Sequence, residues 1–175
     1  MASLPAVDLG IMAEHLSAHE GIINKLNVYH EKATNIELKE IIAFQGNMMR
    51  VHVKVMLALI NPHINDYVEV PDLGAYSVNG YYQRVNKQWA NYDNKWIALE
   101  AHATAKLMSN ENYMSAIMMK DKNVRNAHVE MALQQLEAQK RYAEFINRMG
   151  WAFVPHVSVQ DQVNTYQHFQ HMLNQ

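Results

Sequence analysis

The chain has 175 residues, of which 49% are hydrophobic and 18% charged, and 15 basic against 17 acidic side chains give a net charge of −2. These values exclude a disordered polyelectrolyte, and the lack of a basic surplus argues against nucleic acid as a partner. The length suits one domain over residues 1–175 that buries a core without disulfides. The absence of cysteine excludes thiol catalysis and cysteine-ligated metals.

The first predicted helical hairpin spans about residues 8–61. Its first helix carries a mostly apolar stripe at spacings of three and four, typical of a helix that faces a core: Leu9, Met12, Leu16, His19, Ile23, Leu26, His30 and Ala33. The Thr34-x-x-Glu37 pattern predicts the start of the second helix, because the hydroxyl and the carboxylate each satisfy a free backbone N–H. Asn61-Pro62 predicts its end. The stripe of this second helix contains Leu38, Ile41, Gln45, Met48, His52, Val55 and Leu59.

A connection over about residues 62–92 contains prolines, glycines and tyrosines in place of the helical pattern. The second predicted hairpin spans about residues 93–150, with Asp121 as the N-cap of its second helix. The two stripes contain Trp96, Glu100, Ala103, Leu107, Asn110, Met114 and Ile117, and then Val124, His128, Met131, Gln135, Ala138, Tyr142, Phe145 and Met149. Gly150 has the place of a left-handed C-terminal cap. The tail, residues 151–175, is expected to include a short helix.

These elements predict an all-α fold, namely a ferritin-like four-helix bundle made of two hairpins joined by a long crossover. A connection of about thirty residues can run the full length of a helix, so it permits the up-down-down-up helix order. Aligning the hairpins places Leu38 over Val124, which leaves an internal duplication open. The start from Met1 to Asp8 has no basic segment and no sustained apolar run, so we expect neither a secretory signal nor a membrane anchor.

A ferritin-like topology raises the question of a dinuclear metal site, which takes a Glu from two helices and a Glu-x-x-His from the other two. The second helix has no acidic residue from Ile41 to its end, and Glu130 and Glu137 on the fourth helix have no histidine three residues later. Gly-rich phosphate loops and the Gly-x-Ser-x-Gly nucleophile motif are also absent from the sequence. We therefore predict no catalytic residues, no cofactor and no enzyme activity.

Two histidines remain candidates for a single metal ion. His19 and His52 lie at stripe positions and at similar distances from the turn of the first hairpin, so they should be about one helical turn apart. With Glu20 or Glu100 they supply the three or four ligands that zinc needs. The interpretation that we favour is a buried hydrogen-bond network that sets the register of the helices, formed by the stripe histidines with Gln45, Asn110 and Gln135.

The fourth predicted helix ends in a distinctive segment. It runs from Arg141 to Trp151 as Arg-Tyr-Ala-Glu-Phe-Ile-Asn-Arg-Met-Gly-Trp, and Val154-Pro155 follows. This segment resembles the coat F family of bacterial spore coat proteins, whose unit is a helical hairpin that ends in Gly-Trp shortly before an extended tail. The resemblance covers about residues 93–155, and the first hairpin lacks the Gly-Trp ending. It implies a ferritin-like bundle with a structural role in the spore coat, and it carries over no catalytic residue.

The sequence therefore predicts a non-catalytic structural protein that forms a homo-oligomer, expected to be a dimer, and contacts other coat proteins. The resemblance implies a place in the spore coat after synthesis in the bacterial cytoplasm. The alternative is a ferritin-like metal-binding or oxidase-type protein with a mononuclear site at His19, His52, Glu20 and Glu100. A carrier of a small apolar ligand is a third possibility, suggested by the methionine-rich helix faces.

Overall fold

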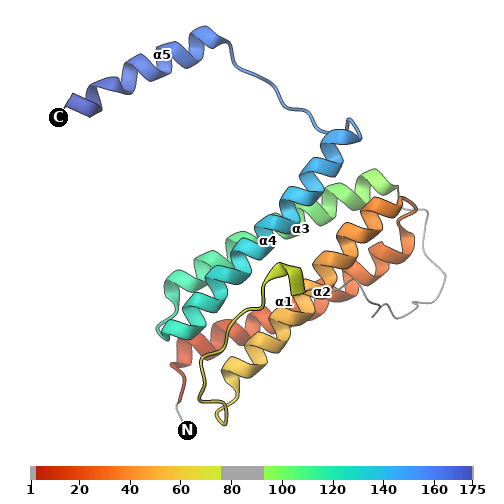
Figure 1. The fold of residues 1–175 in the computed structure, drawn as a ribbon, viewed down its shortest axis with the longest axis vertical. Helices are drawn as coiled ribbons and strands as arrows, with labels where there is room; N and C mark the ends of the chain where they lie inside the picture. Colours follow the sequence, from red (N-terminus) through yellow and green to blue (C-terminus); the bar gives the residue numbers. More distant parts are fainter. Residues whose placement is uncertain (1–2, 76–92, 175) are drawn as a thin grey trace.

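A computed structural model gives the structure of the chain and describes residues 3–75 and 93–174. Over these ranges the chain is all-helical, with no strand, which confirms the predicted all-α class (Figure 1). The α-helices are α1 (Ala6–Lys32), α2 (Ile36–Ile60), α3 (Asn94–Met118), α4 (Lys122–Arg148) and α5 (Val159–Phe169). Short 3-10 helices follow α2 and α5, η1 (Leu73–Ala75) and η2 (Gln170–Asn174). Most of the predicted connection, residues 76–92, lies outside the described residues. Among the helices described, none is both long and apolar enough to cross a membrane.

Hydrogen bonds at the two ends of the bundle define the directions of its helices. At one end, the N–H of Thr34 donates to the Asn94 side chain at 2.9 Å, so the α1–α2 turn lies beside the start of α3. At the other end, buried Asp8 accepts from the N–H groups of Lys120 and Asp121, so the start of α1 lies beside the α3–α4 turn. α1 and α4 therefore run in one direction, and α2 and α3 run in the other. This is the predicted up-down-down-up order (Figure 1).

The helix ends follow from local side-chain chemistry. Asp121 caps α4 as predicted, because its carboxylate accepts from two backbone N–H groups of the first turn. Gly150 has φ 69°, the left-handed conformation expected after α4. The predicted start of α2 needs a correction, since its N-cap is Asn35, whose side chain accepts from the N–H of Leu38. The hydroxyl of Thr34 accepts instead from the Asn94 side chain, which joins the two hairpins.

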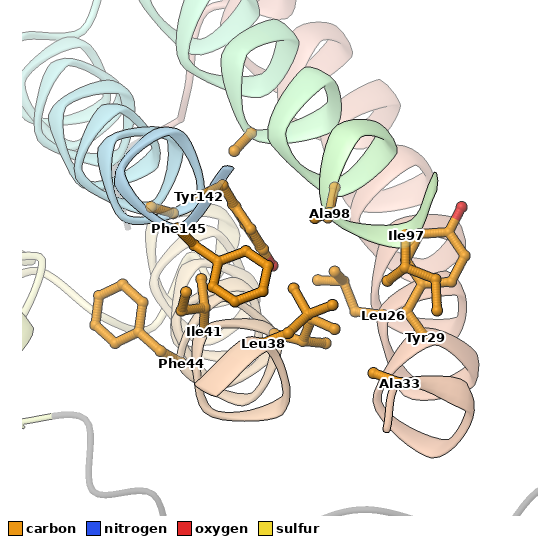
Figure 2. Close-up of a cluster of buried hydrophobic side chains, with 14 of the residues drawn as sticks. Leu26, Tyr29, Ala33, Leu38, Ile41, Phe44, Ile97, Ala98, Tyr142 and Phe145 are labelled. Atoms are coloured by element: carbon orange, nitrogen blue, oxygen red, sulfur yellow. The ribbon is translucent and has the colours of Figure 1, made fainter. Parts of the chain in front are cut away.

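The larger of two core clusters lies between the four long helices, toward the α1–α2 turn. Figure 2 shows side chains from all four converging there, among them Leu26 and Tyr29, Leu38 and Ile41, Ile97 and Ala98, and Tyr142 and Phe145. Burial of one such large apolar side chain stabilises the fold by roughly 1.5–3 kcal/mol. The predicted stripes of α2 and α4 are buried except at their last positions, Leu59 and Met149.

The predicted core face of α3 is wrong. Trp96, Leu107, Met114 and Ile117 were expected in the core, but they are exposed, with Ile117 62% accessible. The buried face lies on the opposite side of the helix and consists mostly of smaller residues. Its members are Ile97, Ala98, Ala101, Thr104, Ala105, Met108, Asn112, Ser115 and Ala116. The stripe of α1 is shifted by one position in places, since Leu9 is exposed and Asp8 is buried. α3 thus presents an apolar stripe to solvent.

The predicted C-terminal helix is present as α5, but it does not join the bundle. Figure 1 shows α5 lying apart from the long helices, at the end of an extended segment that follows α4. None of its residues is buried. The chain therefore has a packed bundle over α1–α4 and an uncovered C-terminal arm, which we define as residues 152–174.

Candidate functional site

Four buried histidines lie together inside the bundle, and we call them the histidine cluster. α1 supplies His15 and His19, one helical turn apart, α2 supplies His52 and α4 supplies His128. Their ring centroids are 5.2 Å apart for His15 and His128, 6.4 Å for His15 and His19, and 5.9 Å for His19 and His52. The rings therefore form a row across the core. The expected approach of His19 to His52 is present within this row.

Each ring of the cluster is oriented by a hydrogen bond at one of its nitrogens. Nδ1 of His19 lies 2.7 Å from the carbonyl oxygen of His15, and Nδ1 of His128 lies 2.8 Å from that of Val124. A carbonyl oxygen only accepts, so both Nδ1 atoms carry the proton and both Nε2 atoms keep a lone pair. Nε2 of His15 lies 3.0 Å from the hydroxyl of Ser115.

The tautomer of His52 follows from its neighbour on α4. The side-chain amide of Gln134 donates from Nε2 to the carbonyl oxygen of Pro71, which directs its Oε1 toward the imidazole. Nε2 of His52 therefore donates to Gln134 Oε1 at 2.9 Å, and Nδ1 of the ring keeps the lone pair. The proton of His52 is therefore on Nε2, whereas the protons of His19 and His128 are on Nδ1.

The second ring nitrogen of every histidine in the cluster lies in the core without a hydrogen bond from any described residue. The four atoms are His15 Nδ1, His19 Nε2, His52 Nδ1 and His128 Nε2. Buried polar atoms in folded proteins are nearly always paired, with protein groups, ordered water or ions. Four unpaired ring nitrogens in one row are therefore the most unusual polar feature of this core.

Burial also determines the charge of the cluster. Removal from water lowers the pKa of His19 and of His128 to about 4 and that of His52 to about 3, and it lowers the pKa of His15. Neighbouring imidazoles lower the pKa values of His19, His52 and His128 further, because two adjacent protonated rings repel each other. The rings are therefore neutral at pH 7, which is the form that binds metal ions.

The structure does not bring the expected carboxylates to these rings. Glu20 is exposed on α1, and Glu100 pairs with Lys25 at 3.3 Å and accepts from the hydroxyl of Tyr29 at 3.0 Å. Across the described ranges, no three His, Asp or Glu side chains are placed to hold one ion. In the histidine cluster, each imidazole therefore has other imidazoles as neighbours. The acidic ligands of a dinuclear site are not among the described residues placed around it.

A polar network beside the cluster matches the favoured interpretation in part. The hydroxyl of Tyr142 donates to Gln45 Oε1 at 2.9 Å, and Gln45 Nε2 donates to Gln135 Oε1 at 3.3 Å, all within the core. These bonds join α2 to α4 at a defined register. Asn110, the third expected member, is exposed, and Asn112 is the buried asparagine of α3.

Two members of the cluster were missed as site residues, His15 and His128. The spacing of His15 and His19 places both on one face of a helix, and this was the available signal. His128 had been placed on the stripe of its own helix, but nothing within the second hairpin relates its height to that of His19. The contacts between the hairpins, at Asp8 and between Thr34 and Asn94, supply that relation.

Two of the cavities lined by described residues are open at the surface. One of about 790 Å³ is bordered by charged groups, including Glu37, Arg141 and Arg148, and another of about 490 Å³ lies between α3 and α4. The methionine-rich faces that suggested a ligand carrier are divided: four of their side chains lie in the core, whereas Met114 and Met118 are exposed. The four in the core are Met48, Met49, Met56 and Met119. No family model, curated protein or solved structure matches this chain.

Proposed function

We propose that this chain is a non-catalytic structural protein of the bacterial spore coat, which associates with further copies of itself and with other coat proteins. The observation that carries the proposal is the exposed apolar stripe of α3. The helix order is that of ferritin-like folds, and Gly150-Trp151 follows the end of α4; both features support the resemblance to the coat F family. Polar groups in the core then serve to set helix register.

The stripe of α3 has the properties of an association surface. Leu107, Met114 and Ile117 recur at helical spacing on one face and are 53–62% exposed. Large apolar side chains that gather on one exposed face mark interaction sites more often than scattered ones do. Burying one such side chain in an interface contributes roughly 1.5–3 kcal/mol, before the cost of association. We expect this face to be covered in the assembled protein.

The test is the molar mass of the full chain in solution, measured by light scattering across a range of concentrations. We expect a dimer or larger species, and we expect Leu107→Lys to shift it to monomer, because a charge is costly in an apolar interface. Leu57→Lys on α2 is the matched control, since Leu57 is 53% exposed but lies outside the α3 stripe. A strict monomer at high concentration, or an equal effect of both substitutions, would contradict the proposal.

The histidine cluster favours a second candidate function, the binding of a transition-metal ion. Neutral imidazoles with an unpaired ring nitrogen suit zinc or copper, and the other nitrogen of each ring is already held by a hydrogen bond, as in many metal sites. His19 and His52 would supply ligands together with His15 or His128 after a small convergence of the rings. The expected partners Glu20 and Glu100 lie elsewhere, so a mononuclear site that includes these carboxylates has no support, and no redox step is proposed.

Elemental analysis of untagged protein separates this candidate from the structural network. Metal binding predicts close to one ion per chain, retained on dialysis and lost in His19→Ala. His156→Ala is the control, because His156 is exposed on the arm. Protein that contains no metal, and that takes up none from a zinc solution, would leave the cluster as a structural network.

A further inference from the structure

We propose that α5 of one copy docks into the groove between α3 and α4 of a second copy, so that the C-terminal arms link neighbouring bundles. This inference rests on the self-association proposed above and names the surfaces that carry it. It starts from two apolar features of the same chain. One is an amphipathic helix that lies outside its own bundle (Figure 1), and the other is an open groove between α3 and α4.

α5 needs a partner surface. It has 11 residues and buries none of them, and an isolated helix of that length is marginal in water because helix nucleation is costly. Its apolar side chains nevertheless lie on one face, at spacings of three and four: Val159, Val163, Tyr166 and Phe169, each 39–75% exposed. A cap from Ser158, whose hydroxyl accepts from the N–H of Asp161, defines where the helix begins. This pattern is typical of helices that bind in apolar grooves.

The groove matches the arm in length and in character. It holds about 490 Å³ and is lined along α3 from His102 to Tyr113, a span of about 16 Å at the helical rise, which equals the length of an 11-residue helix. Leu133 and Leu136 form its apolar wall on α4, and both are exposed. A hydrogen bond of 2.6 Å from Gln139 to the His102 ring closes one end.

The charges of both parts suit a buried contact. Asp161 is the only formally charged side chain of the arm, residues 152–174. Among the described residues that line the groove, Lys106 is the only Lys, Arg, Asp or Glu. The centres of protein interfaces are depleted in charge, and the two charges present here have opposite signs. A strongly charged partner would leave most of its charges unpaired in this groove.

The geometry at the end of α4 favours a second copy over the chain's own groove. The N–H of Trp151 donates to the carbonyl oxygen of Ile146 at 3.0 Å, and its ring packs on Phe145 at 5.7 Å. With Gly150 in the left-handed conformation, these contacts direct the following chain away from the bundle (Figure 1). For α5 to reach the groove of its own chain, the backbone would have to reverse its direction within residues 152–158, where Pro155 restricts it.

Cysteine cross-linking tests the inference directly, because the chain has no native cysteine. Full-length Val163→Cys is mixed with full-length, size-tagged Leu136→Cys and oxidised, and a mixed disulfide-linked dimer is expected on a non-reducing gel. Asn164→Cys on the polar face of α5 replaces Val163→Cys in one control. Leu57→Cys on α2 replaces Leu136→Cys in another. We expect several-fold less mixed dimer in both.

A double variant, Val163→Cys with Leu136→Cys in one chain, distinguishes two arrangements. In exchange, α5 binds the groove of a second copy; in fold-back, α5 binds the groove of its own chain. Exchange predicts linked dimers and higher species, whereas a disulfide within one chain would overturn the inference. Mixed dimer no more abundant than in the controls would overturn it too. If the chain nevertheless associates through Leu107, the proposed function stands and only the arm contact fails. If the chain is strictly monomeric and no mixed dimer forms, both fail.

Discussion

At the scale of single residues, the histidine cluster combines two opposing effects. Each ring donates or accepts one good hydrogen bond, so it is held in place, yet each also keeps a second nitrogen that no described residue pairs with. An unsatisfied buried polar atom costs about 1–3 kcal/mol relative to a paired one. A core that holds four of them is less stable than an apolar core of the same shape, so ordered water or a metal ion at these atoms would add stability.

The lowered pKa values predict a loss of stability in acid. In the unfolded chain the histidines take up protons near pH 6.5, whereas His19 and His128 in the fold do so only near pH 4. The unfolded state therefore binds more protons between these values. The free energy of unfolding is at its full value above pH 6.5 and falls as the pH drops toward 4, by roughly 3 kcal/mol for each of these two groups.

Thermal unfolding followed by circular dichroism from pH 4 to pH 8 measures this effect. His128→Leu should flatten the curve, since it removes one of the responsible rings, while His156→Leu should leave the shape unchanged because His156 is exposed. A melting temperature that does not vary between pH 4 and 7 would show that the cluster is not neutral and buried in solution.

At the scale of elements, Asp8 joins the start of α1 to the α3–α4 turn. Its carboxylate accepts from the backbone N–H groups of Lys120 at 2.9 Å and Asp121 at 2.7 Å, and it is fully buried. Asp8→Ala removes both acceptors, so we expect a loss of about 2–3 kcal/mol in urea unfolding. Asp8→Asn keeps one acceptor oxygen and should lose less. An alanine variant as stable as the wild type would contradict this role.

Two glycines of similar surroundings should respond to alanine with opposite signs. A Cβ at Gly21 or at Gly150 would meet nothing within 4 Å. Gly21 lies within α1, where alanine has the better helix propensity, so Gly21→Ala should raise stability by up to about 1 kcal/mol. Gly150 has φ 69°, so Gly150→Ala should cost about 1 kcal/mol. Urea unfolding of the two variants measures the difference, and the same sign for both would refute the assigned backbone conformations.

The sequence was sufficient for the helices and their order, but not for every face. The stripes of α2 and α4 were predicted well because large apolar side chains mark the buried side. On α3 the same criterion chose Leu107 and Met114, which are exposed, whereas Ala101 and Ala105 are buried. Small residues allow the backbones of α3 and α4 to approach closely, and periodicity in large side chains does not detect such a face. The predicted stripe of α1 contains Leu16 in place of its neighbour His15, so His15 was not identified as a buried residue.

At the scale of the whole molecule, the apolar surface is distributed unevenly. The bundle has a packed interior, yet the outer stripe of α3, the groove beside it and one face of α5 are all exposed. These exposed apolar faces are the basis of the proposed self-association. The net charge of −2 is compatible with that proposal, because a small net charge opposes association only weakly.

Removal of the arm should leave the bundle intact. α5 buries no residue, so a chain that ends at Val157 should unfold within about 1 kcal/mol of the full chain at concentrations where both are monomeric. A chain that ends at Gly150 is the matched comparison. It also lacks Trp151, whose ring packs on Phe145 at 5.7 Å, and should lose a further 1–3 kcal/mol or so. Urea unfolding at low concentration measures both values, and light scattering at high concentration should show less oligomer in both. If the chain that ends at Val157 showed a large loss of monomer stability, α5 would have to pack on its own bundle.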